Sequence, residues 1–335
     1  MKTLNVKKEV IKTKGLISKE GYYQQDTTWE GFGVNSQEEY EEKFVIKSNF
    51  HNAVHEDVIS SYKTIEYLMA HAYFHYPMFD EAKKKLLHMV EMAVKLRNKE
   101  LGNSLTFETR NGRTRKKTLN QLIDELVQFD YPEEFIGRLN WIRDKRNMAS
   151  HPDRHSFGGG MYKNMFYPII NCLNELFLLP NKLVEYKSEL EKYKDLENLK
   201  GVFKVPHKNK AVLGYDPEIR HCWLDNNTWI YSVYFQPVLT NTKESLENHI
   251  TSPPILNILS NLIVSDKGIE AIDTKTGEKI EFEKTTKSEN LERYNSHISD
   301  LKKLNSDGRI YYTISLGKSK HYEVEMAIYN TWDNY

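Results

Sequence analysis

The sequence contains very little cysteine: Cys172 and Cys222 are the only two in 335 residues. Two cysteines so far apart cannot form the disulfide framework of a small secreted domain or a four-cysteine zinc site. We therefore expect a reducing, cytoplasmic environment. The chain also has no excess of charge of either sign, since Lys+Arg and Asp+Glu both number 47. This balance argues against a protein that global charge holds on nucleic acid or on a membrane.

Long apolar runs are missing as well. Residues Met1–Leu16 mix lysines with isolated apolar residues and lack the apolar run of about 7–15 residues that a secretory signal requires. The most apolar stretch, Pro168–Pro180, contains Asn171, Asn174 and Glu175, and it is shorter than the roughly 20 residues that cross a bilayer. No secretory signal and no membrane span are expected.

The glycine-rich motifs that bind phosphate groups are absent too, both the Walker A motif and G-x-G-x-x-G. The triplet Gly158-Gly159-Gly160 is not followed by Lys-Ser or Lys-Thr. We interpret it as a flexible hinge rather than a phosphate-binding loop.

The first half of the chain has a strong helical periodicity. Residues 1–48 are polar and contain the acidic run Glu38, Glu39, Glu41 and Glu42, so we interpret them as an N-terminal arm. From Asn49 onward, apolar residues recur at spacings of three and four, as on one face of a helix. This pattern predicts a helix that ends near residue 75, followed by helices over 79–101, 119–129, 132–150 and 161–196.

After Gly201 the composition changes toward strands. Aromatic residues gather in one such region, at Trp223, Trp229, Tyr231, Tyr234 and Phe235, and aromatic strands favour a core or an interface. Strands are predicted over 202–205, 219–224, 228–235, 269–272, 279–283, 309–316 and 321–329, with helices over about 243–263 and 288–304. The predicted fold class is therefore multidomain: an arm (1–48), an all-α helical bundle (49–198) and a mixed, β-rich α+β domain (199–335).

One segment carries a pattern typical of catalysis. Arg146 and Asn147 stand near the end of a predicted helix, and His151 follows five residues after Arg146, where Pro152 stops the helix. At this spacing the arginine and the histidine project from nearby points of one helical face. A histidine titrates near pH 6.5 and serves as base or acid, while an arginine offers a charged, planar fork to phosphate oxygens.

Arg146-Asn147-x-x-x-His151 resembles the R-x4-6-H motif of the HEPN superfamily, many of whose members are RNA-cleaving toxins or antiviral effectors. The resemblance covers about residues 49–195 and implies a HEPN-like helical bundle there. It also implies a metal-independent endoribonuclease that cleaves tRNA or mRNA by 2′-hydroxyl attack, with Arg146, Asn147 and His151 as catalytic residues. Neither a cofactor nor a metal is implied. HEPN nucleases bring two motifs together, so the resemblance implies a homodimer with a composite active site.

Several further residues are candidates for the same site. Glu91 is expected either to pair with Arg146 or to be exposed, and His155 is an auxiliary candidate. A basic segment without acidic residues contains Arg110, Arg113, Arg115, Lys116 and Lys117. It is either a solvated loop or a segment that binds RNA phosphates. In the second case Arg143, Lys145 and Arg154 are further RNA-binding candidates. The C-terminal domain is expected to act as a regulator or sensor that receives an antitoxin or an activating ligand or protein.

Three alternatives remain open at this point. Arg146 and His151 would serve structure alone if they only satisfied the carbonyls at a helix end. A HEPN module without catalysis would bind a nucleotide or a partner protein. The i,i+4 pairs His51/His55 and His71/His75 would suit a metal-dependent hydrolase.

Overall fold

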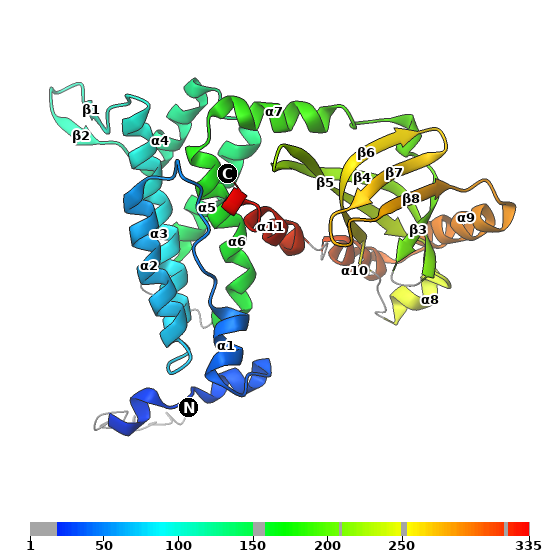
Figure 1. Cartoon of the computed structure of the whole chain (residues 1–335), viewed down its shortest axis with the longest axis horizontal. Coiled ribbons are helices and arrows are strands. Elements are labelled where there is room, and N and C mark those ends of the chain that lie inside the picture. Colours follow the sequence, from blue (N-terminus) through cyan, green and yellow to red (C-terminus); the bar gives the residue numbers. More distant parts are fainter. Residues whose placement is uncertain (1–18, 150–157, 208–209, 249–252, 318–320, 335) are drawn as a thin grey trace, which may run out of the picture.

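The computed structural model describes residues 19–149, 158–207, 210–248, 253–317 and 321–334. A helical half and a β-barrel half lie side by side (Figure 1). The helical half contains, in chain order, η1 (Lys19–Tyr23), η2 (Thr27–Phe32), α1 (Gln37–Phe44), α2 (Glu56–His71), α3 (Met78–Glu100), β1 (Thr106–Glu108), β2 (Thr114–Lys116), α4 (Leu119–Leu126), η3 (Val127–Phe129), α5 (Glu133–Ala149), η4 (Gly159–Met165), α6 (Phe166–Phe177) and α7 (Pro180–Glu191).

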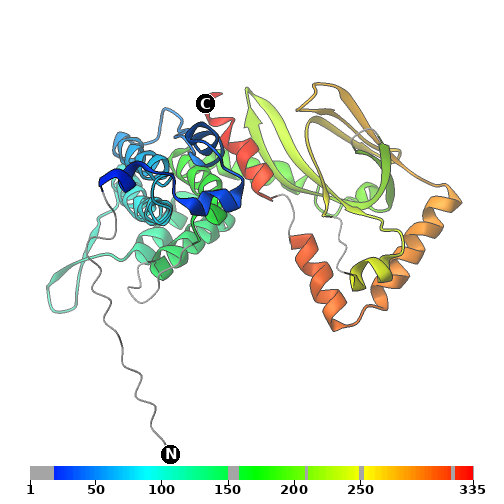
Figure 2. The ribbon, with the colours of Figure 1, turned by 90° about the horizontal axis from the view of Figure 1, so that it is seen from below.

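The second half begins with η5 (Glu197–Leu199) and is dominated by strands. Its elements are β3 (Val202–His207), β4 (Lys210–Asp225), β5 (Thr228–Pro237), α8 (Thr242–Glu247), β6 (Ile255–Ser265), β7 (Gly268–Asp273), β8 (Lys279–Lys284), α9 (Ser288–Lys302), α10 (Ser306–Gly317), α11 (His321–Tyr329) and η6 (Trp332–Asn334). Helices α8, α9 and α10 lie together on one side of the barrel (Figure 2). Within the described ranges, no helix combines the length and apolar character that crossing a bilayer would require.

Helix α6 forms the centre of the helical half. Every residue of α6 except Pro168 is buried, and α6 packs against α3 and α11. A helix that is apolar on all sides must be enclosed by other elements. Helix α2 instead buries one stripe, at Val58, Tyr62, Ile65 and Met69, as the predicted periodicity requires.

The N-terminal segment packs into this core through an aromatic cluster around Trp29. The Trp29 side chain is fully buried, and its Nε1 donates a hydrogen bond of 2.7 Å to the carbonyl oxygen of Ala72. The rings of Tyr40 and Tyr76 lie 4.6 Å and 4.8 Å from the Trp29 ring.

The glycine triplet 158–160 lies under the same cluster. A Cβ atom on Gly160 would come within 2.9 Å of both Trp29 and Phe44, and Gly159 has a positive φ of 35° with Tyr76 directly against it. The triplet therefore permits close packing, and the interpretation as a flexible hinge was wrong.

The β-barrel closes through strands that are far apart in the sequence. Strands β3 to β8 pair antiparallel in order, and β8 pairs back onto β3 at Phe203–Lys284 and Lys204–Glu283. Inside, the rings of Phe235 and Phe282 stack with centroids 4.9 Å apart, and Phe203 lies 5.8 Å from Phe235. These side chains fill a small barrel as expected for six strands.

Helix α11 returns from the barrel half to the helical half. Asn171 of α6 donates through Nδ2 to the backbone oxygen of Glu325 at 2.8 Å and to its carboxylate at 2.7 Å. Trp332 then donates through Nε1 to Oδ1 of Asn171 at 2.8 Å, and Asn49 donates to the carbonyl of Tyr329 at 2.7 Å. The end of the chain is thus bonded to the core of the first half.

The predicted fold class was wrong. The second half contains a closed six-stranded antiparallel barrel rather than a mixed α+β domain, and the hairpin β1–β2 interrupts the helical half, which is therefore not all-α. Alternation along one strand shows which residues face inward, but closure depends on the pairing of β3 with β8. The structure is a helical region joined to a β-barrel.

Three segment predictions in the second half were also wrong. The segment 309–316 lies in α10 and 321–329 forms α11, where strands were expected. In α11 the apolar residues alternate as in a strand, yet Val324 and Ile328, which are four residues apart, are buried. Tertiary packing against α6 therefore overrides the local pattern. The helix expected over 243–263 is replaced by α8 and most of β6, because short apolar runs fit either period.

Candidate functional site

Helix α5 places the predicted catalytic residues at its C-terminal end. Phe135, Ile136, Leu139 and Ile142 are buried and hold α5 against its neighbours. Arg146 lies in the last turn, where a cation interacts favourably with the helix dipole. Its guanidinium forms an ion pair with Glu91 of α3, and its Nη1 donates a hydrogen bond of 3.1 Å to Oδ1 of Asn147.

Glu91 lies among several cations. Its carboxylate also accepts a hydrogen bond of 2.6 Å from Lys95, one turn further along α3. Burial opposes ionisation, but the hydrogen bond from Lys95 and the charges of Lys95, Arg146 and His88 outweigh it, so the pKa of Glu91 lies below its usual value. The ionised carboxylate therefore holds Arg146 in place.

The candidate residues that follow Arg146 differ in how far the structure describes them. Asn147 is exposed, and the side chain of Arg146 is 28% exposed. His151, Arg154 and His155 lie outside the described residues. The structure thus brings together Arg146, Asn147 and Glu91, and their catalytic roles stay predictions.

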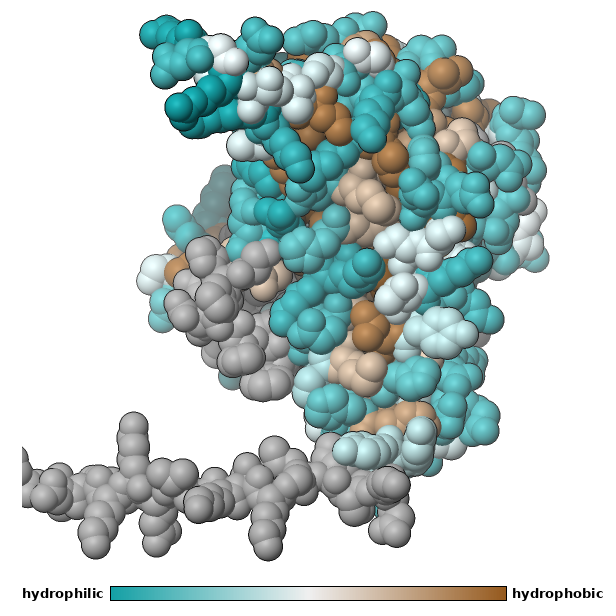
Figure 3. Space-filling model, turned by 90° about the vertical axis from the view of Figure 1, so that its left-hand side faces the viewer, coloured by the Kyte–Doolittle hydropathy of each residue, from teal (hydrophilic) through white to brown (hydrophobic). Residues whose placement is uncertain are grey.

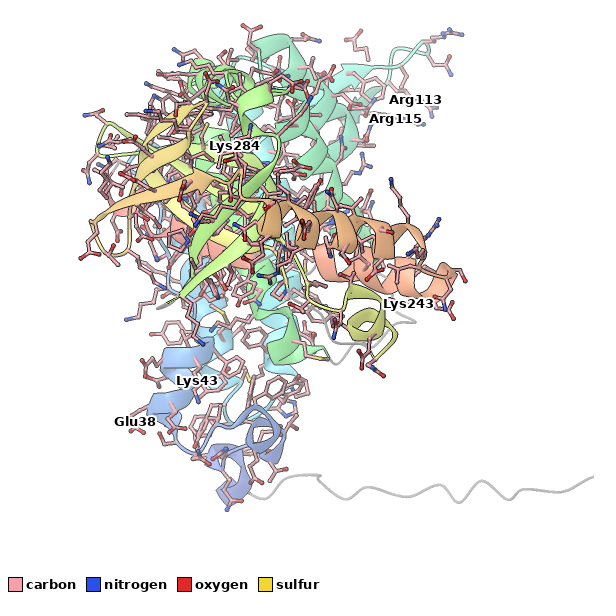
Figure 4. All side chains as sticks on the ribbon, turned by 90° about the vertical axis from the view of Figure 1, so that its right-hand side faces the viewer. Glu38, Lys43, Arg113, Arg115, Lys243 and Lys284 are labelled. Atoms are coloured by element: carbon pink, nitrogen blue, oxygen red, sulfur yellow. The ribbon has the colours of Figure 1, made fainter. Side chains whose placement is uncertain are left out.

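The basic segment forms a β-hairpin that projects from the helical half. Strands β1 and β2 pair at Phe107–Arg115, and Gly112, with φ of 69°, provides the turn between them. Figure 4 shows Arg113 and Arg115 pointing away from the helices, and Figure 3 shows the same projection as a strongly hydrophilic knob at the upper left.

The cations of this hairpin are largely without acidic partners. All residues from 110 to 116 are exposed, and among the described residues none of the four cations of that span takes part in an ion pair. Lys117, at the base, does pair with Glu125 of α4 at 2.5 Å. The hairpin therefore presents Arg110, Arg113, Arg115 and Lys116 to solvent.

Two other RNA-binding candidates are engaged within the protein. Arg143 donates to Asp144 at 2.8 Å and to Asn140 at 2.6 Å, and it also contacts Asn120 of α4. The contact with Asn120 ties the motif helix α5 to α4, the helix that follows the hairpin. Lys145 lies over the ring of Trp141, with Nζ 5.7 Å from the centroid.

The two histidines of the pair His51/His55 make separate contacts within the protein. His51 is buried, with Nε2 2.9 Å from the carbonyl oxygen of Asn174, and burial lowers its pKa. His55 instead caps α2, where its Nδ1 accepts a hydrogen bond of 3.1 Å from the backbone of Asp57. Across the described ranges, no group of three or more His, Cys, Asp or Glu side chains is arranged to hold a metal ion.

A cavity of about 840 Å³ lies between the two halves, and the sequence analysis missed it. Residues of α5, η4, α6, α7, β4 and α11 line it, including Arg138, Glu175, His221 and His321. These residues come from segments spread over most of the chain and share no motif, so no local signal marks them.

Comparison with known proteins gives no match. No family model fits the chain, and no curated protein and no solved structure is similar enough to be matched.

Proposed function

We propose that this chain is a metal-independent endoribonuclease that uses the HEPN-type motif Arg146-Asn147-x-x-x-His151. The observation that carries the proposal is the ion pair between Arg146 and Glu91, which holds the guanidinium at the end of α5 beside Asn147. A fixed guanidinium next to an exposed amide suits a phosphate group better than a mobile side chain does, because less side-chain freedom is lost on binding.

The proposed chemistry assigns one task to each residue. His151 removes the proton from a ribose 2′-hydroxyl, and the 2′-oxygen attacks the adjacent phosphorus. Arg146 and Asn147 donate to the phosphate oxygens as negative charge develops on them. The bond from phosphorus to the 5′-oxygen breaks, and that oxygen takes up a proton, so that the proton removed by His151 is returned overall. The products are a 2′,3′-cyclic phosphate and a 5′-hydroxyl.

One chain supplies one such set, so we propose that a homodimer forms the composite cleft. The exposed hairpin supports an RNA substrate, tRNA or mRNA, because its four solvent-facing cations suit a phosphate backbone. A cytoplasmic nuclease must be restrained, and the C-terminal half is the proposed place for an antitoxin or an activating ligand or protein. The biological role proposed is that of a toxin or antiviral effector.

The second candidate function is a non-catalytic module that binds a nucleotide or a partner protein. It is favoured by the same ion pair, because Glu91 already neutralises the charge of Arg146 without any substrate. The two functions differ in whether purified protein cleaves RNA.

The first prediction is that cleavage depends on the motif. Wild type, His151→Ala and Arg146→Ala are incubated with tRNA and with mRNA in EDTA, and cleavage rates are measured on gels. We expect each variant to lose at least about 100-fold, the lower range for removal of an acid–base group such as His151 or of a transition-state donor such as Arg146. Mapping of the new ends should give 2′,3′-cyclic phosphates.

The matched control is His75→Ala, which removes an exposed histidine from the loop between α2 and α3. It should cleave like wild type. Undiminished cleavage by folded His151→Ala would exclude the catalytic assignment, and no cleavage by the wild type of either RNA would favour the binding module.

A further inference from the structure

The cavity between the helical half and the barrel has apolar walls. Phe135, Trp141 and Ile142 of α5 form one side, Tyr186 and Leu190 of α7 another, and Ile328 of α11 a third. Its volume of about 840 Å³ lies within the range of roughly 300–1,000 Å³ that binds compact organic molecules. Part of this lining stays accessible, since Trp141 is 41% exposed.

Arg138 brings a positive charge into this apolar space. Its Nη2 contacts the carboxylate of Glu175, which is only 9% exposed. Arg138 lines the cavity, and 41% of its side-chain surface is accessible. Its guanidinium also lies over the ring of Phe135, 5.4 Å from the centroid. Its remaining N–H groups donate no hydrogen bond to any described residue, so Arg138 has donors to spare.

The barrel and α11 place three more nitrogen-bearing side chains at the cavity. Arg220 and His221 come from β4, and His321 comes from α11, with the rings of His221 and His321 5.4 Å apart. Arg220 donates through Nε to Glu218 at 2.7 Å and lies over the ring of Tyr234, which leaves its Nη groups for a ligand. Burial, together with the charges of His321, Arg138 and Arg220, lowers the pKa of His221 to about 3. The fields of these three groups therefore converge at one point of the cavity wall.

The carboxylates at the cavity are already engaged. Glu175 contacts Arg138, and Glu325 accepts from Asn171 and lies 3.4 Å from Nε2 of His321. Two further carboxylates line the cavity: Glu134 pairs with Lys187 at 3.0 Å, and Glu191 pairs with Lys194 at 3.5 Å. Acceptors are thus occupied while donors remain, which favours a ligand that brings negative charge.

We propose that this cavity binds an organic anion, with an aromatic or branched apolar body between α5 and α7 and an oxyanion head group at Arg138, Arg220 and His321. The site is distinct from the ribonuclease motif and does not depend on it. Arg138 and Arg146 nevertheless stand on the same helix, about two turns apart, so a bound ligand contacts the element that carries the motif.

The test uses two fluorescent probes on the full chain. Anilinonaphthalene sulfonate has an apolar ring system and one sulfonate, and phenylnaphthylamine has the same rings without the charge. We expect saturable binding of one sulfonate probe per chain, with at least tenfold higher affinity than for the uncharged probe.

Two variants locate the binding. Arg138→Met/Glu175→Met removes both charges together, because removal of the arginine alone would leave a buried carboxylate unpaired. Arg220→Met removes a cation from the barrel side. Each should weaken sulfonate binding at least tenfold and leave phenylnaphthylamine binding unchanged. The matched control Arg113→Met, in the exposed hairpin, should change neither.

Three results would overturn the proposal: no saturable binding of the sulfonate, equal affinity for the two probes, or unchanged sulfonate affinity in the folded double variant. If the double variant does not fold, Arg220→Met decides alone. RNA cleavage is not measured in this test, so its failure leaves the ribonuclease proposal untouched.

Discussion

At the scale of single residues, partly buried polar side chains position the site. The ion pair between Glu91 and Arg146 is 20% and 28% exposed, and such pairs stabilise a fold by at most about 1 kcal/mol. Its main effect is therefore to fix the direction of the guanidinium. Asn171, fully buried, similarly orients the end of the chain through two hydrogen bonds to Glu325 of α11 and one from Trp332 of η6.

A buried histidine should make the barrel half sensitive to acid. His297 of α9 is 1% exposed, and its Nδ1 lies 2.7 Å from the hydroxyl of Thr242. Burial lowers its pKa to about 4, although the charge of Asp300 opposes the shift. Between pH 6.5 and 4, His297 binds a proton in the unfolded chain but not in the folded chain. Stability should fall by about 1.4 kcal/mol per pH unit there.

Urea unfolding of wild type and His297→Gln, followed by tryptophan fluorescence at pH 7.5, 6 and 5, checks this prediction. Other groups also titrate, so the quantity of interest is the difference in unfolding free energy between the two proteins. Wild type should lose stability relative to the variant as the pH falls. Parallel curves would contradict the assignment.

At the scale of elements, the hairpin β1–β2 stands apart from the core. All six strand residues are exposed, and an isolated two-stranded hairpin is only marginally stable in water. Phe107, opposite Arg115, is 38% exposed. These residues contribute little to the packing of the fold, which is consistent with a role in binding.

Removal of the hairpin charges should change RNA binding and its salt dependence. Arg110, Arg113, Arg115 and Lys116 are replaced together by Gln, and RNA affinity is measured at several salt concentrations. The slope of log affinity against log salt should become shallower by about 3, because each phosphate contact contributes about 0.7–0.9. The melting temperature should stay the same, since exposed substitutions rarely alter stability by more than about 0.5 kcal/mol.

The matched control replaces four exposed lysines of the barrel half, Lys267, Lys275, Lys302 and Lys303, by Gln. It makes the same change in net charge at a different place. If the slope of log affinity against log salt becomes equally shallow in both proteins, RNA binding depends only on total charge, and the hairpin has no specific role in it.

At the scale of the whole molecule, the chain connects the two halves twice. The chain enters the barrel through α7 and returns through α11 (Figure 1). Glu189 of α7 accepts a hydrogen bond of 2.7 Å from Tyr231 of β5, and Tyr186 accepts one from Cys222 at 3.1 Å. The cavity lies between these connections, so a ligand there contacts both halves.

Loss of the contact at the end of the chain should destabilise the helical half. Trp332 is 3% exposed, donates to Asn171 and lies against the ring of His51. We expect Trp332→Ala to lower the free energy of unfolding by about 3–5 kcal/mol, as for other buried aromatic residues. Urea unfolding measures this loss of free energy. The control is Trp141→Ala, which removes a half-exposed tryptophan and should cost under about 1 kcal/mol. Equal effects would mean that the C-terminal segment does not pack as described.

Local features of this protein can be predicted from neighbouring residues. The periodicity of 54–75 and 79–101 predicts α2 and α3, Pro132 with Glu133 and Glu134 predicts the start of α5, and the strands near 202, 228, 269 and 279 lie where their composition indicates. The sequence predicted the ion pair between Glu91 and Arg146 only as one of two alternatives, because packing decides which sides of α3 and α5 contact each other.

Closure of the barrel, the helical state of α11 and the cavity could not be predicted in this way. Pairing of β3 with β8 joins residues about 80 positions apart. The apolar residues of α11 alternate as in a strand, but α11 is a helix because its packing against α6 buries Val324 and Ile328 on one helical face. The cavity exists only where six separate segments meet. Spacing and propensity act between near neighbours in the chain, whereas these features arise from contacts between residues that only folding brings together.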